Sequence, residues 1–160
     1  MKYHINLTYM DIKTFEVAEV ALIYKSKVKA SLRPTITKSA DAFQVLKKHW
    51  NLETIDFLEH FKVMLLNRAN RVLGIIEISA GGMAGTVADP KVIFAAAIKS
   101  AATGIILAHN HPSGNLKPSH ADINLTRKLK SGGELLDISV LDHLIISGEG
   151  FFSFADEGMI

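Results

Sequence analysis

Two histidines and one aspartate in the C-terminal half of the chain have the residue types and the spacing of a metal site. His109 and His111 are separated by one residue and follow a short apolar run, 104–108 (GIILA), which is typical of a buried central strand. If the extended conformation continues past this strand, period-two geometry places both imidazoles on the same side. Asp122 follows His111 by eleven residues, which is enough chain to return its carboxylate to the two imidazoles.

This set of side chains predicts a particular kind of metal chemistry. Two neutral imidazoles and one carboxylate leave a fourth position open, which is the arrangement of catalytic rather than structural zinc. A zinc ion there would lower the pKa of its bound water to about 7 and supply hydroxide near neutral pH. The chemistry also needs a group that takes a proton from the water and delivers it to the leaving group.

Glu59 is the best candidate for that acid and base. It begins an alternating segment, 59–67, and falls on the side of the apolar Phe61 and Val63, where a carboxylate is badly placed for stability. Glu53 and Glu77 also lie on the N-terminal side of the histidines and remain alternatives.

Each of these residues also has an ordinary structural interpretation. Ser119-x-x-Asp122 is a helix capping box, an isolated His-x-His is most often polar surface, and Glu59 alone is most often a solvated charge at a strand end. The combination of a buried strand, His-x-His-Pro, a polar turn and the Ser/Asp pair favours the metal site.

The segment HNHPSGNLKPSHAD closely resembles the JAMM signature of the MPN-domain metalloproteases, which is His-x-His, seven residues, Ser, two residues and Asp. The surrounding segments ILAHNHPSG, PSHAD and LDHLIISGEGFFSFADEG are more similar still to the RadC family. The resemblance covers about two-thirds of the chain, from Thr54 to the C-terminus.

The resemblance implies that His109, His111 and Asp122 bind one zinc ion per chain. It implies that Glu59 is the acid and base and that Ser119 donates a hydrogen bond to the oxyanion. The expected activity is that of a JAMM-type zinc hydrolase, a metallopeptidase or isopeptidase acting on a peptide or protein. The alternative is a RadC-like accessory protein of DNA repair or mobile elements that acts by binding and has a structural or vestigial metal site.

The sequence departs from the related families at three places. Asn110 stands between the histidines, where deubiquitinating JAMM enzymes usually have Ser or Thr, and Lys91 in DPKVIF stands where the RadC family usually has arginine. The first fifty residues show no Gly-bearing motif like the N-terminal helix-hairpin-helix region of RadC proteins, which puts a DNA-binding role inherited from that region in doubt and leaves DNA a weakly supported partner.

The elements that must position these residues alternate between strands and helices. We expect an α/β fold, a single domain with a mixed β-sheet flanked by helices, MPN/JAMM-like with cytidine-deaminase-like layering. The RadC-like core would cover about 54–160, and residues 1–53 would form an N-terminal extension packed on it. The expected strands are 17–24, 59–67, 71–79, 104–108 and two in the terminal segment 135–154. Three helices are expected: one from a cap at Ser39 to about residue 50, one from a cap at Asp89 to about residue 102, and one from a cap at Ser119 to about residue 131. The last of these helices would end at Gly132-Gly133.

Two further groups of residues have open interpretations. Asp142-His143 in the terminal strand resembles an Asp-His pair of the RadC family. One of the two could hydrogen-bond a metal ligand, or both could be buried polar residues with their own hydrogen-bond partners, which is the more common case. Lys25, Lys27 and Lys29 are expected to form a solvated face, and Gly81, Gly82 and Gly85 a loop at the rim of the site.

The composition limits the remaining function classes. The chain has 160 residues, 48% of them hydrophobic, which suits one domain without a covalent staple. It has no cysteine, which excludes disulfides, Cys-ligated zinc and thiol catalysis. No apolar run approaches the ~20 residues of a membrane span and no secretory signal is evident, so we expect a cytoplasmic protein. A net charge of +2 does not by itself indicate DNA binding, and an oligomer remains open.

Overall fold

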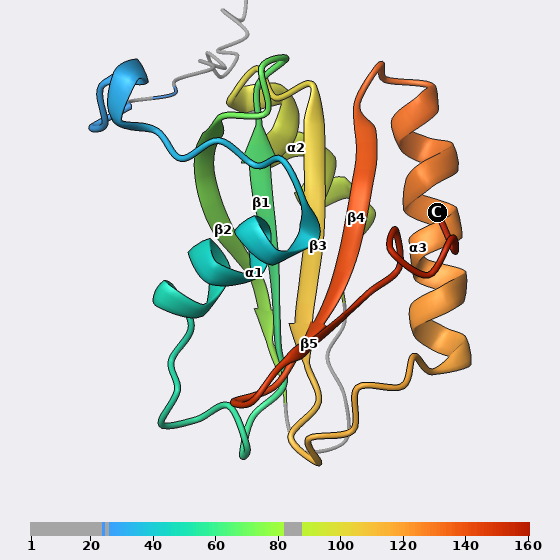
Figure 1. Cartoon of the computed structure of the whole chain (residues 1–160). Helices are drawn as coiled ribbons and strands as arrows, with labels where there is room; N and C mark the ends of the chain where they lie inside the picture. The colour runs from blue at the N-terminus through green and yellow to red at the C-terminus, as the bar shows by residue number, and fades with distance from the viewer. Residues whose placement is uncertain (1–23, 25, 82–87) are drawn as a thin grey trace, which may run out of the picture.

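Five strands form one mixed sheet in the order β2-β1-β3-β4-β5 in the computed structural model, which describes residues 24, 26–81 and 88–160 (Figure 1). The strands are β1 (His60–Leu66), β2 (Val72–Ala80), β3 (Gly104–Asn110), β4 (Ser139–Ile146) and β5 (Phe151–Ser153). β1 is antiparallel to both β2 and β3, β3 is parallel to β4, and β4 is antiparallel to β5. The expected mixed sheet of an α/β domain is confirmed.

Helices cover both faces of this sheet (Figure 1). α1 (Ser39–Lys48) packs on one face, and α2 (Pro90–Lys99) and α3 (His120–Glu134) pack on the other. The alternation of β1 divides its side chains between the two cores. Met64 and Leu66 contact the α1 side, whereas Val63 and Leu65 contact the α2 and α3 side.

The central strand β3 is buried along its whole length, as its apolar sequence predicts. It extends to Asn110, two residues beyond the expected end, because its backbone stays paired with β1 as far as His109 and with β4 as far as Asn110. His109 therefore belongs to the strand and is held on both sides, opposite Phe61 and Ile145.

The N-terminal expectations are tested only in part. The expected strand 17–24 and Lys25 lie outside the described residues, apart from Tyr24, and the same holds for Gly82 and Gly85. Lys27 and Lys29 are exposed and lie outside any strand.

The expected caps of the first two helices have different outcomes. Ser39 is the first residue of α1 rather than its cap, because the Asp41 carboxylate accepts hydrogen bonds from the amides of Thr37 and Lys38 instead. Asp89 caps α2 as expected, through a hydrogen bond from the amide of Lys91 at 2.9 Å. α2 ends at Lys99 rather than near Ala102. Ala101, two residues after the helix, has a positive φ of 54°, which is not a helical conformation.

The prediction that α3 ends at Gly132-Gly133 is wrong, because the helix continues through both glycines to Glu134. These glycines are sites of close approach rather than a cap. A Cβ on Gly133 would lie 2.2 Å from the carbonyl oxygen of Ile138, and one on Gly132 would lie 3.0 Å from the ring of Phe94.

Gly133→Ala should therefore destabilise the protein, although alanine is the better helix former. The clash is with backbone, so we expect a loss of about 1–3 kcal/mol in the free energy of unfolding. Gly132→Ala is the matched control and should cost less, because the Phe94 ring can move where a backbone carbonyl cannot. Chemical denaturation of the two variants checks the difference, and equal stability of Gly133→Ala and the wild type would contradict this packing.

Candidate metal centre

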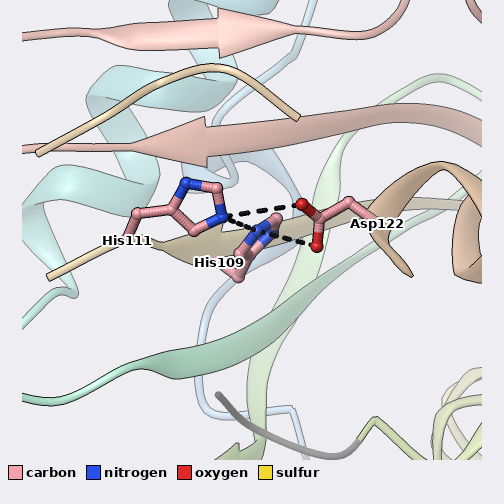
Figure 2. Close-up of side chains that lie close together, drawn as sticks. All are labelled: His109, His111 and Asp122. Atoms are coloured by element: carbon pink, nitrogen blue, oxygen red, sulfur yellow. Dashed lines mark hydrogen bonds and ion pairs between the residues drawn. The ribbon is translucent and has the colours of Figure 1, made fainter. Parts of the chain in front are cut away.

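His109, His111 and Asp122 lie together beside the end of β3 (Figure 2). His109 projects from the strand on the α2 and α3 side, and His111 follows just after the strand ends. Their Nε2 atoms are 2.9 Å apart, so the extended backbone does place both imidazoles on one side. The expectation that both imidazoles lie on the same side is confirmed.

Asp122 reaches the two imidazoles from the first turn of α3 (Figure 2). Its Oδ1 lies 3.3 Å from Nε2 of His109, and its Oδ2 lies 3.6 Å from Nε2 of His111. Two ligand atoms in a tetrahedral zinc site lie about 3.3 Å apart, given zinc–ligand distances of about 2.0–2.1 Å. The donor types and their separations both fit a zinc ion with a fourth position left open.

Ser119 caps α3 and also fixes the Asp122 carboxylate. Its hydroxyl donates to Oδ2 at 2.6 Å and its backbone amide donates to the same oxygen at 2.7 Å. The amide of Asp122 donates in return to the Ser119 hydroxyl at 3.2 Å. Asp122 can therefore be part of the capping box and part of the candidate metal site at once, because the cap holds Oδ2 while Oδ1 faces His109.

The second nitrogen of His111 also has a defined partner. Nδ1 lies 2.6 Å from the backbone carbonyl oxygen of Asn115. Since a carbonyl oxygen only accepts, Nδ1 carries a hydrogen, and Nε2 is the nitrogen that faces the site.

The charges in this cluster reinforce one another. The hydrogen bond to Asp122 raises the pKa of His111, against the opposing effect of burial. Burial alone would raise the pKa of Asp122, but the adjacent imidazoles of His109 and His111 hold it well below its usual range. Asp122 is thus ionised at neutral pH, as a metal ligand must be.

Zinc affinity should accordingly fall as the pH is lowered towards the pKa of His111 and below it. Because that pKa is raised, the proton competes with the metal at a higher pH than it would on a free imidazole. Below this pKa we expect a loss of roughly tenfold per pH unit for the one proton displaced. Competition with a chromophoric chelator at a series of pH values measures this, and an affinity independent of pH from neutral to mildly acidic conditions would contradict the assignment.

Glu59 immediately precedes β1 and is half-buried. Its charge contributes to raising the pKa of His111, so it lies within electrostatic range of that imidazole. The two alternatives are placed differently. Glu53 is exposed in the preceding turns, and Glu77 is 3.2 Å from His60 and 3.3 Å from Lys62, whose side chains lie on the α1 side of the sheet.

Asn110 ties the segment that carries Glu59 to strand β3, which carries the candidate ligand His109. Its side-chain amide donates to the carbonyl oxygens of Ile55 at 2.6 Å and Leu58 at 2.8 Å. Its Oδ1 accepts from the amide of His60 at 2.8 Å. The residue between the histidines thus points to the opposite face and holds the backbone on both sides of Glu59.

Asp142 and His143 are both buried, but their side chains have different partners. The carboxylate of Asp142 accepts from the hydroxyl of Ser153 at 2.7 Å and the amide of Ala155 at 3.0 Å, which fastens the C-terminal turn. The imidazole of His143 instead contacts His109, with 2.9 Å between Nε2 of His143 and Nδ1 of His109. His143 therefore hydrogen-bonds a candidate metal ligand, whereas Asp142 is a buried residue with its own hydrogen-bond partners.

Sequence reasoning missed Thr126, which contacts His143 from α3. Its hydroxyl lies 2.6 Å from Nδ1 of His143 and donates to the carbonyl oxygen of Asp122 at 2.6 Å. The available signal was its position four residues after Asp122, which puts both residues on the same face of a helix.

Comparison with known proteins identifies the class to which this fold and cluster belong. A family model described as the RadC-like JAB domain matches residues 36–159, and the chain belongs to this family. The matched region begins at Ile36 and so includes α1.

Curated bacterial relatives named UPF0758 protein are similar over most of the chain. The relative from Flavobacterium johnsoniae is 45% identical over 126 residues, which is 78% of this chain and 53% of the relative. The relative from Rubrobacter xylanophilus is 40% identical over 129 residues, which is 80% of this chain and 55% of the relative. The chain therefore spans about half the length of the curated relatives that it matches, and their names state no activity.

The helices offer no membrane span within the described part of the chain. None of them is both long enough and apolar enough to cross a bilayer.

Proposed function

We propose that this domain is a zinc-dependent hydrolase that cleaves peptide or isopeptide bonds. The observation that carries the proposal is the convergence of two imidazole nitrogens and one carboxylate, 2.9–3.6 Å apart. Membership of the RadC-like JAB domain family supports it, since the proposed ligands lie within the matched residues. One zinc per chain would be held by Nε2 of His109, Nε2 of His111 and Oδ1 of Asp122.

A zinc ion in this position supplies two kinds of chemistry, a lowered pKa for water and polarisation of a substrate carbonyl. The protein residues then have separate tasks. Glu59 accepts a proton from the attacking water and returns it to the leaving amine. Its half-buried position beside the cluster supports this role over the same role for Glu53 or Glu77.

Ser119 is proposed to stabilise the developing oxyanion of the substrate. Its hydroxyl is exposed and donates to Asp122 in the absence of substrate. When the hydroxyl turns to the substrate, the backbone amide of the same residue still holds Asp122 at 2.7 Å. Ser119 can therefore donate to an oxyanion without releasing the ligand carboxylate.

The proposal is tested with the zinc-loaded protein and a library of natural peptides together with isopeptide-linked conjugates. New N-termini detected by mass spectrometry should appear with the wild type, disappear on chelation and return with added zinc. If the zinc-loaded wild type produced no new termini beyond those of Glu59→Gln, the hydrolase proposal would fail. Binding of duplex DNA by the same zinc-loaded protein in a separate titration, together with no new termini in the library, would favour the accessory-protein alternative.

A further inference from the structure

A chain of three hydrogen bonds links two of the candidate metal ligands through residues outside the ligand set. Nδ1 of His109 lies 2.9 Å from Nε2 of His143, and Nδ1 of His143 lies 2.6 Å from the hydroxyl oxygen of Thr126. The Thr126 hydroxyl lies 2.6 Å from the carbonyl oxygen of Asp122. The chain thus begins at one candidate ligand and ends on the backbone of another.

The direction of every hydrogen bond in this chain follows from its last member. The Asp122 carbonyl oxygen only accepts, so the single hydroxyl hydrogen of Thr126 must point to it. The Thr126 oxygen must then accept from His143, which places a hydrogen on Nδ1 of that imidazole. A neutral His143 consequently has a bare Nε2 and accepts from Nδ1 of His109.

The surroundings of His143 favour the neutral form. Its side chain is fully buried, and its ring stacks on Phe154 with 4.8 Å between centroids and lies 5.7 Å from the ring of Phe61. The uncharged imidazole has one donor and one acceptor, which is what its two partners require.

We propose that Thr126 and His143 are positioning residues that fix the tautomer of His109, so that its Nε2 is bare and accepts from Nε2 of His111 at 2.9 Å before any metal binds. The metal-binding purpose of this arrangement rests on the proposed function, whereas the tautomers themselves do not. The carbonyl oxygen of Asn115 accepts from Nδ1 of His111, so both imidazoles have Nδ1 bound to a partner outside the centre and present Nε2 to it. A site prepared in this way avoids the cost of changing tautomer when the metal enters.

Imidazole nitrogen chemical shifts of isotope-labelled, metal-free protein near neutral pH test the proposal directly. For His109 and His143 we expect a protonated Nδ1 and a bare Nε2. The exposed His49 serves as an internal reference and should show the averaged shifts of two exchanging tautomers. A bare Nδ1 on either buried histidine would overturn the proposal, and this result does not depend on whether the protein hydrolyses anything.

Thr126→Val and Thr126→Ser form a matched pair for the second readout. Valine keeps the shape but removes the hydroxyl, so the tautomers of both histidines should become mixed and zinc affinity should fall by about tenfold. Serine keeps the hydroxyl and should restore the wild-type shifts and affinity. Thermal unfolding separates a general loss of packing from this effect. Unchanged nitrogen shifts in folded Thr126→Val would overturn the proposal, whatever the zinc affinity of that variant.

Discussion

Asp122→Ala should abolish stoichiometric zinc binding at micromolar protein concentrations. Zinc binding free energies of about 10–16 kcal/mol divided among four ligands correspond to a loss of roughly a hundred- to thousandfold or more in affinity per ligand. Removing this carboxylate also removes the hydrogen bond and the charge that raise the pKa of His111, so the substitution changes a second candidate ligand as well. Native mass spectrometry after zinc loading measures the stoichiometry.

Asp122 is also part of a helix cap, so the experiment needs a variant that loses a cap alone. Asp41 provides it, because it lies at the third position of α1 and accepts from the amides of Thr37 and Lys38 as Asp122 accepts from that of Ser119. Both alanine variants should lose stability, because each removes a helix cap. Only Asp122→Ala should lose zinc, and full retention of zinc in that variant would remove Asp122 from the proposed ligand set.

Glu59→Gln should retain zinc and lose hydrolysis. Glutamine has the same size and can still accept a hydrogen bond, but it cannot take a proton from water at neutral pH. General acid–base catalysis contributes roughly a hundred- to ten-thousandfold, so we expect kcat to fall by that factor on a substrate cleaved by the wild type. Steady-state kinetics combined with metal analysis of the same sample measures both halves of this prediction.

The other two upstream carboxylates are the matched controls for this variant. Glu53→Gln and Glu77→Gln should leave kcat within about twofold of the wild type, since surface substitutions away from a site have small effects. Glu77→Gln should reduce stability slightly through its contacts with His60 and Lys62. A fully active Glu59→Gln, or an inactive variant at either other position, would move the acid and base to a different residue.

The parts of the site that follow from local geometry were predictable from sequence. The all-apolar run before His109 indicated a buried strand, and the period of an extended chain then placed His111 on the same side. The Ser119-x-x-Asp122 spacing indicated a helix start, and the structure shows that a cap and a candidate ligand can be the same carboxylate. Local patterns and the metal geometry agree here because both depend on backbone conformation within a few residues.

The parts that depend on contacts between distant segments were not predictable. Gly132 and Gly133 have the sequence of a helix end, but the approach of the Ile138 carbonyl explains Gly133 without one. Asn110 appeared only as a departure from a related family, whereas its three hydrogen bonds reach segment 55–60 across the sheet. No local pattern reports which backbone groups a buried amide will meet.

Anomalous diffraction at the zinc absorption edge from crystals of the zinc-loaded protein tests the central claim most directly. We predict one strong peak per chain, about 2.0–2.2 Å from Nε2 of His109, Nε2 of His111 and Oδ1 of Asp122. Glu59 should lie near the peak without contacting it as a ligand. Absence of a peak at this position, or a peak held by other residues while these three remain in contact with one another, would contradict the account.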